Sequence, residues 1–235
     1  ELIGRDKLQR YVELFGLSDS VSFDGITTAT GNFDLTAATA EQVAWSGIGQ
    51  HKDQINPCAY MRYMGAIAGG ADRLELCSAL SIGGLTPYTE LLRQIRAESD
   101  IPVRCLMRPR AGDFLYTPEE IQMMAAQIEV LREAGANGFV IGCLDADGNL
   151  DGKAMEPLLK AAEGTGLTLH RCIDVSHNPC KTYMDAMALG IDTILTSGAA
   201  SGCMQGMETI GVLLQMRDAY QGPEVLVGAG VNAKV

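Results

Sequence analysis

The sequence predicts an α/β fold of the parallel (β/α) TIM-barrel type with about six βα units, and two observations lead to this prediction. Six short apolar runs recur along the last two thirds of the 235-residue chain, and a helix-length stretch separates each run from the next. Such alternation, at a period of roughly 25 to 35 residues, is typical of parallel sheets. Polar or glycine-rich residues end five of the runs, where barrels of this type build their sites.

The predicted elements follow one another in a regular order. The strands are RLELC (73–77), VRCLMRPR (103–110), GFVIGCLD (138–145), LTLHRCID (167–174), TILTSG (193–198) and EVLVGAG (224–230). A glycine-rich loop, residues 81–87, leads from the first strand to an amphipathic helix over residues 89–97. The next helix, residues 117–134, begins with a threonine cap, a proline and two acidic residues. Helices over residues 153–162 and 181–189 are each followed closely by a glycine.

The first 69 residues differ in character from the rest of the chain. Helix-like stretches over residues 40–47 and 58–68 predict a mainly helical segment that supplies no strand in register with the sheet. We therefore expect two parts, a helical segment over residues 1–69 and a barrel-type domain over residues 70–235.

The composition narrows the function classes. A formal net charge of −11 argues against nucleic acid as a partner, and 47% hydrophobic residues suffice for a substantial core. No apolar run approaches the roughly 18 residues that span a bilayer, and the N-terminus lacks the pattern of a signal peptide. We therefore expect a cytoplasmic protein without a membrane partner.

The ends of two predicted strands carry the residues from which we expect a site. Because side chains alternate along a strand, Arg108 and Arg110 should share one face. By the same rule, His170 and Asp174 should share a face, with Arg171 on the opposite one. Three arginines and a histidine at neighbouring strand ends predict a site for an anionic group. A surface or structural role for each arginine is the alternative.

Two glycines at the end of the last run point to the same kind of ligand. Gly228 and Gly230 would leave backbone amides open to a ligand, and a helix beginning near Asn232 would direct its positive end toward them. Turning the chain is the alternative role for these glycines.

The seven cysteines match no zinc or disulfide pattern. Burial in the core is the simplest role for most of them. The alternative is a Cu(I) site, because thiolates suit that ion. Cys77 is then the candidate ligand, since it ends its strand beside the ligand face. Cys105 has the opposite parity to Arg108 and is expected to face the helices.

Several separate motifs, in the right order, resemble the CutC copper-homeostasis family from about residue 69 to residue 235. They are ADRLELC (71–77), GGLTP (83–87), RPRAGDFLY (108–116), LD (144–145), DG (147–148), HR (170–171), LTSG (195–198) and GAGV (228–231). The resemblance implies a TIM-barrel fold, a cytoplasmic location and a role in copper tolerance, with a polar barrel mouth like that of an enzyme. The site positions that it implies are Glu75, Arg108, Arg110, Asp113, Asp145, His170, Arg171 and Asp174. We add Ser197, in the matching LTSG motif, as a ligand-binding residue.

The sequence departs from that family at both ends of the barrel. The family's first strand, and its eighth strand with the closing helix, are not found. Six strands cannot close a barrel of eight, so an incomplete barrel is expected. Other segments or other chains, as in a homo-oligomer, would have to cover its edges. Ala111 and Cys172 replace the family's usual glycine and alanine, and neither change removes a charged site residue.

Residues 1–70 resemble a different family, the transpeptidase domain of penicillin-binding proteins. The likeness rests on GRDKL (4–8), FGL (15–17), AWSGIGQ (44–50), NP (56–57) and MGAIAGG (64–70). The S-x-x-K, S-x-N and K-T-G motifs are absent, so this segment is not expected to acylate. A junction of two unrelated fragments fits both resemblances, and a divergent N-terminal extension is the alternative.

Three functions remain to be distinguished. The first is a copper-homeostasis protein of the CutC type that binds copper, as Cu(I), or a small anionic molecule. The second is a barrel enzyme acting on a phosphorylated or carboxylate metabolite. In that case His170 would be the acid or base, Asp174 or Glu75 its partner, and the arginines the clamp. The third is an inactive transpeptidase fragment.

Overall fold

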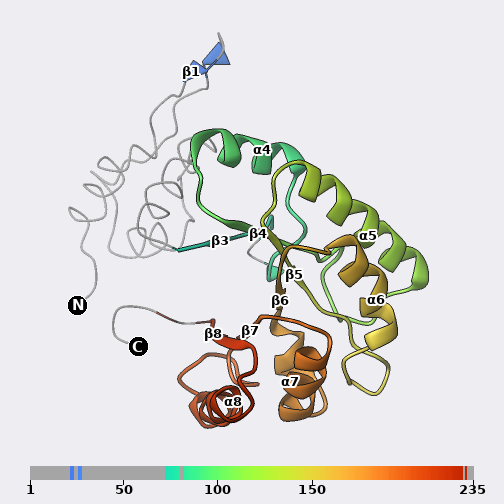
Figure 1. Ribbon diagram of the computed structural model, residues 1–235, viewed down its shortest axis with the longest axis vertical. Helices are drawn as coiled ribbons and strands as arrows, with labels where there is room; N and C mark the ends of the chain where they lie inside the picture. The colour runs from blue at the N-terminus through green and yellow to red at the C-terminus, as the bar shows by residue number, and fades with distance from the viewer. Residues whose placement is uncertain (1–21, 24–25, 28–71, 80–81, 230, 232–235) are drawn as a thin grey trace, which may run out of the picture. The chain divides into compact units, whose positions relative to one another are not determined.

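A computed structural model of the protein describes residues 22–23, 26–27, 72–79, 82–229 and 231 (Figure 1). The chain divides into two units, Glu1–Asp72 and Arg73–Val235. In the first unit, two short strands, β1 (Ser22–Phe23) and β2 (Ile26–Thr27), pair in antiparallel fashion. The helical stretches expected before residue 70, and the motifs that resemble a transpeptidase, lie outside the described residues.

The second unit contains one sheet of six parallel strands that curls into half of a barrel (Figure 1). The strands pair in chain order, from β3 at one edge to β8 at the other. They are β3 (Leu74–Leu76), β4 (Val103–Leu106), β5 (Gly138–Ile141), β6 (Gly166–Leu169), β7 (Thr193–Thr196) and β8 (Glu224–Val227). The predicted fold class and the order of its six strands are therefore confirmed. Within the described ranges, no further strand pairs with the outer edge of β3 or β8.

A helix follows each strand from β3 to β7, as the alternation predicts. The helices are α4 (Thr89–Glu98), α5 (Pro118–Glu133), α6 (Gly152–Ala161), α7 (Pro179–Ala188) and α8 (Met207–Tyr220). Thr117 forms a capping box with Glu120 at the start of α5, which confirms the predicted cap. The side chains of Asp151 and Asn178 also accept backbone N–H groups, so α6 and α7 begin slightly before their predicted positions.

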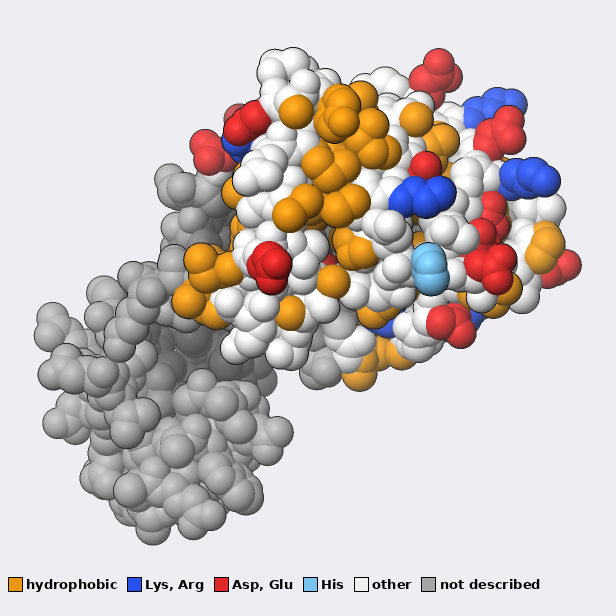
Figure 2. Space-filling view, turned by 90° about the horizontal axis from the view of Figure 1, so that it is seen from below, with side chains coloured by type: hydrophobic (Ala, Val, Ile, Leu, Met, Phe, Trp, Pro, Cys, Tyr) orange, Lys and Arg blue, Asp and Glu red, His pale blue; other side chains and the backbone are white. Residues whose placement is uncertain are grey.

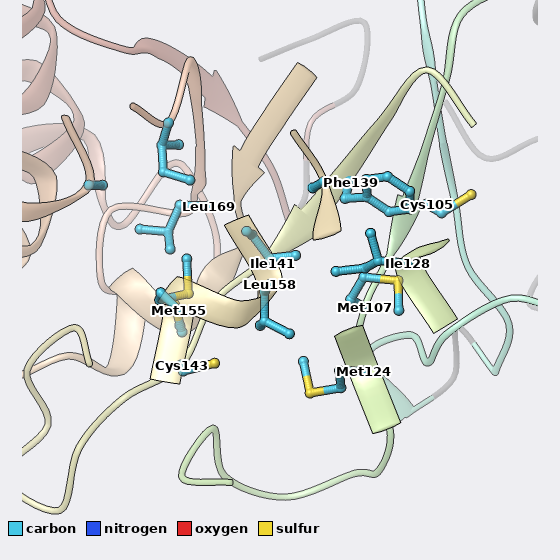
Figure 3. Packing of buried hydrophobic residues seen from close by; sticks show 14 of the residues in the cluster. Cys105, Met107, Met124, Ile128, Phe139, Ile141, Cys143, Met155, Leu158 and Leu169 are labelled. Carbon is cyan, nitrogen blue, oxygen red and sulfur yellow. The ribbon is translucent and has the colours of Figure 1, made fainter. Parts of the chain in front are cut away.

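Alternate residues of each strand point to opposite faces of the sheet. On the outer face, Cys105 of β4 and Phe139 and Ile141 of β5 belong to the same hydrophobic core as Met124 and Ile128 of α5 (Figure 3). All five are fully buried. The other set of strand residues lines the inside of the half-barrel, which we call the inner face. Cys105 thus lies on the helix side, as its parity predicts.

The strands are shorter than the apolar runs, and this corrects one prediction. β6 ends at Leu169, and a 3-10 helix, η2 (Arg171–Val175), follows it. The prediction that His170 and Asp174 share a strand face opposite Arg171 is therefore wrong, because strand alternation does not extend beyond β6. In a 3-10 helix, residues three apart lie on the same side, so Arg171 and Asp174 come together.

Charges of both signs are mixed on the described surface. On the face that Figure 2 shows, Lys and Arg side chains lie among Asp and Glu side chains and form no basic patch. Among the described helices, none is long and apolar enough to cross a membrane.

Candidate functional site

The loops at the C-terminal ends of the strands enclose a buried arginine, Arg108, which follows β4. Its guanidinium donates to the carbonyl oxygens of Ile82 at 3.0 Å, Gly84 at 3.1 Å and Gly112 at 3.0 Å. The glycine-rich loop can wrap so closely because Gly84 adopts a positive φ of 86°. The guanidinium carbon lies 5.3 Å from the centre of the Phe114 ring. No carboxylate in the described part of the chain forms an ion pair with Arg108, which is only 8% exposed.

His170, which follows β6, lies against the same aromatic ring. The imidazole and the Phe114 ring have centres 4.7 Å apart, and His170 is 4% exposed. Its Nδ1 accepts the backbone N–H of Cys172 at 3.2 Å, whereas its Nε2 is buried and has no partner in the part of the chain that the structure describes. Burial, and then the positive charge of Arg108, lower the pKa of His170 to about 3. The ring is therefore neutral at physiological pH.

The backbone directly after β5 makes room for this histidine at Gly142. A Cβ atom there would lie 2.7 Å from Cε1 of His170 and 2.5 Å from Sγ of Cys172. Both distances are too short for any side chain, so glycine is required for the imidazole to pack against the end of β5.

A second cluster, at the ends of β6 and β7, is saturated with hydrogen bonds. The Asp174 carboxylate accepts from Nε of Arg171 at 2.7 Å, from the backbone N–H of Ser197 and Ala199 at 3.0 Å each, and from the hydroxyl of Thr196. Arg171 also donates to the Ser197 hydroxyl at 2.7 Å. Burial alone would raise the pKa of Asp174, but these hydrogen bonds together lower it. Asp174 is therefore ionised and fully engaged, and it makes no hydrogen bond to His170.

Arg110 belongs to a third set of contacts. Its guanidinium pairs with Glu120 at 2.7 Å and with Asp113 at 2.9 Å, and it lies 5.2 Å from the ring centre of Tyr116. Two carboxylates thus neutralise Arg110, so it adds little positive charge to a ligand site beside Arg108. The expectation that both arginines clamp one anion is not supported by this geometry.

Glu75 lies at a different level of the inner face. Strand pairing aligns it with Arg104 of β4, which in turn aligns with the first residue of β5. Arg108 is four residues further along, or roughly 13 Å at about 3.3 Å per residue. Glu75 pairs with Arg73 at 3.2 Å, and burial, partly offset by Arg73, raises the pKa of Glu75. Among the described hydrogen bonds, the Glu75 carboxylate accepts from Arg73 and none joins it to His170.

Sequence reasoning missed Arg104, whose side chain crosses the inner face. Its guanidinium donates to Thr168 at 2.7 Å and to Asp192 at 2.6 Å. A Cβ atom on Gly138 or Gly166 would collide with this side chain. The signal that could have found it is the pair of glycines that begin two successive strands, beside an arginine inside a third.

Cys77 directly follows β3 and is only partly buried. Its Sγ lies 3.3 Å from the position that a Cβ atom on Gly84 would occupy. Burial, and then the charge of Glu75, raise the pKa of the Cys77 thiol. The core thiol of Cys105 has its pKa raised to about 12 by burial. The described residues contain no group of three or more His, Cys, Asp or Glu side chains that could hold a metal ion.

Two of the remaining predicted residues, Asp145 and Gly228, form hydrogen bonds with backbone groups. Asp145 accepts the N–H groups of Asn149 at 2.8 Å and Asp147 at 2.9 Å, and these bonds lower its pKa. The N–H of Gly228 donates to the Thr196 carbonyl at 2.8 Å, so the prediction of an open amide there is wrong. Gly230 lies outside the described residues, as does the helix start expected near residue 232.

Comparisons with known proteins agree on one family. Residues 58–235 match the model of the CutC family. A CutC family protein of Xanthomonas campestris pv. campestris (strain B100) is 43% identical over 165 residues, which are 70% of this chain and 68% of that protein. One of Erwinia tasmaniensis is 42% identical over 163 residues, which are 69% of this chain and 64% of that protein. The chain thus spans about two thirds of the length of these curated relatives.

A solved structure gives the same result. The crystal structure of the putative copper homeostasis protein CutC from Streptococcus agalactiae matches with a TM-score of 0.65 and 30% sequence identity. The match covers 69% of this chain and 80% of that one.

Proposed function

The chain belongs to the CutC family, and from this premise we propose that it acts in copper homeostasis by binding Cu(I), as cargo, through the thiolate of Cys77. The description of the Streptococcus agalactiae structure as a putative copper homeostasis protein supports the role. We propose a cytoplasmic location as well, since a reducing compartment keeps cysteines available as thiols.

The position of Cys77 is the observation that carries the proposal. Of the six cysteines that the structure describes, only Cys77 and Cys180 are partly exposed. Cys180 lies in the first turn of α7, beyond η2, and does not directly follow a strand. Among the described cysteines, Cys77 alone combines access to solvent with a place directly after the C-terminal end of a strand, where barrel proteins bind their ligands.

The chemistry of the thiol suits a cargo ion. Because its pKa is raised, Cys77 is protonated at neutral pH, and Cu(I) binding must release that proton. Cys105 cannot complete the coordination, since it lies in the hydrophobic core on the other face of the sheet. We therefore expect an exogenous thiol to supply the second sulfur, which would leave the ion free to be passed on.

Cu(I) stoichiometry, measured against a colorimetric chelator in the presence of glutathione, tests this function. Cys77→Ser should abolish the bound equivalent, whereas Cys180→Ser, the matched partly exposed control, should leave it unchanged. Cys105→Ser should also leave it unchanged. Equal loss from Cys77→Ser and Cys105→Ser, or no Cu(I) bound by the parent chain, would overturn the assignment.

A second function, an enzyme acting on an anionic metabolite, is favoured by one separate observation. Arg108 is a buried cation without a carboxylate partner in the described chain, and it lies beside a buried histidine. Buried charges are normally paired, so an anionic ligand is the natural partner. A thermal-shift screen of phosphorylated and carboxylate metabolites tests this function, and no hit in either class would contradict it.

A further inference from the structure

We infer that Arg108 and His170 form a receptor for the carboxylate of a small organic acid, in which His170 is a neutral hydrogen-bond donor and not a base. The inference names the ligand class for the second function above, on which it rests, and is independent of Cu(I) binding at Cys77. Four observations carry it: an unpaired buried cation, the tautomer of a buried imidazole, two unused donors beside one ring, and the charge of the neighbours.

The first observation is that the guanidinium of Arg108 is held by neutral groups. Its two terminal nitrogens are occupied by the carbonyl oxygens of Ile82, Gly84 and Gly112. These bonds and the Phe114 ring orient the guanidinium, but none of them supplies a negative charge. The Nε–H group is buried and has no acceptor among the described residues. Arg108 is thus held rigidly with two of its five N–H groups unused, one of them the buried Nε–H, and with one positive charge unpaired in the described chain.

The second observation fixes the proton on His170. The backbone N–H of Cys172 can only donate, so Nδ1 of His170 must carry its lone pair toward it. In a neutral ring the proton is then on Nε2. Burial and the charge of Arg108 keep the ring neutral, which agrees with this tautomer. The Nε2–H group is therefore a second buried donor without an acceptor.

The two donors belong to side chains that contact the same ring. The guanidinium carbon of Arg108 lies 5.3 Å from the centre of Phe114, and the centre of the His170 ring lies 4.7 Å from it. The hydroxyl of Tyr116, two residues further along the same loop, is also buried without a partner. Unpaired polar groups inside a protein are costly, and these three, two between β4 and α5 and one directly after β6, call for a hydrogen-bond partner.

The charge of the neighbours selects the class of acceptor. Arg108 offers one positive charge, because Arg110 is neutralised by Glu120 and Asp113, and Arg171 is held by Asp174. A carboxylate brings one negative charge and two acceptor oxygens, which matches one cation and two donors. A phosphate dianion would bring a second charge that no free cation of these clusters balances. Against a carboxylate, a neutral Nε2–H group can stabilise developing negative charge but cannot remove a proton.

NMR of the ¹⁵N-labelled full-length chain tests the tautomer directly. The chain has three histidines, so His170→Gln and the exposed control His177→Gln assign the imidazole signals. We expect His170 to give the pattern of an Nε2–H tautomer, unchanged from about pH 5 to pH 8. An imidazolium near pH 6, or an Nδ1–H tautomer, would overturn the inference.

Titration of the same sample tests the ligand class. Sodium acetate and sodium pyruvate should shift the His170 Nε2 and Arg108 Nε signals in a saturable way, whereas inorganic phosphate at equal ionic strength should not. No saturable shift with either carboxylate would mean that water fills the donors, and a stronger response to phosphate would mean that the ligand class is wrong. Both outcomes would overturn the proposal.

Variants separate this site from the others. Arg108→Lys should weaken carboxylate binding at least about tenfold, since lysine cannot reproduce the fixed guanidinium. Arg93→Lys, on the exposed surface of α4, should leave it unchanged. Cys77→Ser should abolish Cu(I) binding and keep the carboxylate response, so failure of one function is distinguishable from failure of the other. If Arg108→Lys does not fold, titration of the parent chain still decides.

Discussion

Two clusters at the same end of the half-barrel each contain an arginine, Arg171 in one and Arg108 in the other, and they differ in whether their hydrogen bonds are complete. In the cluster around Asp174, a carboxylate receives hydrogen bonds from Arg171, Thr196, Ser197 and Ala199. In the cluster around Arg108 and His170, buried donors have no acceptor. A complete network stabilises the fold, whereas an incomplete one is available to a ligand. Residue type alone therefore does not identify the functional cluster.

Asp174→Ala removes the acceptor of the complete network, and we expect its loss of stability to be the largest of the predicted effects. The change would leave Arg171 and the donors of the β7–α8 loop without an acceptor, because the Asp174 side chain is 5% exposed. Breaking a buried charged network costs about 3 to 5 kcal/mol, and water can reach Arg171, so we expect about 3 kcal/mol. Urea unfolding measures it. Asp113→Ala, at an exposed carboxylate, is the control and should change the midpoint little, and equal losses would contradict the contrast.

Gly142→Ala should have the next largest effect and should act on the other cluster. The new methyl group would collide with His170 and Cys172, and overpacking of this kind costs about 1 to 3 kcal/mol. The histidine signals should shift and the carboxylate response should weaken. Gly211→Ala is the control, because nothing lies within 4 Å of a Cβ atom there. In the helix α8 it should stabilise the protein by about 0.5 to 1 kcal/mol. Destabilisation by both would argue against a specific clash.

Lowering the pH should remove the contribution of Asp174 to stability, and we expect this effect to be smaller than those of the two substitutions above. The folded-state pKa of Asp174 is lowered, so its contribution is complete above the unfolded value of about 3.9 and is lost as the pH falls through the folded value. Asp174→Asn should therefore be less stable than the parent chain near pH 7, with a difference that shrinks in acid. Urea midpoints from about pH 2 to pH 7 measure it, and a constant difference would contradict the assignment.

The sequence was sufficient to predict the sheet but not the ends of its strands. The apolar runs located all six strands because one face of each packs against the hydrophobic core. Phe139 of β5 is fully buried there, and the edge strands β3 and β8 are partly buried. The run through His170 still alternates beyond Leu169, yet the chain there forms η2, stabilised by a bond from a backbone N–H to an imidazole. Periodicity cannot detect such a local bond, and the strand-face argument for Asp174 failed for this reason.

The candidate site was predicted in part. Arg108, His170 and Asp174 do lie at the C-terminal ends of strands, as the parallel fold requires. Which of these side chains has all its hydrogen bonds filled depends on the conformation of the loops. The loop before α4, for example, places the carbonyl groups of Ile82 and Gly84 against Arg108. Arg104 was missed because an arginine within a strand gives no apolar signal, although the opposing glycines mark its path.

The side chain of Arg104, which crosses the inner face of the sheet, also affects how the half-barrel folds. Its guanidinium joins β4 to Thr168 and Asp192, which are 64 and 88 residues further along the chain. Contacts of such sequence separation close large loops, and loop closure slows the search for the native state. We therefore expect these bonds to form late, after the neighbouring strands have paired. Their loss would then accelerate unfolding much more than it slows folding, so Arg104 would act mainly on the lifetime of the native state.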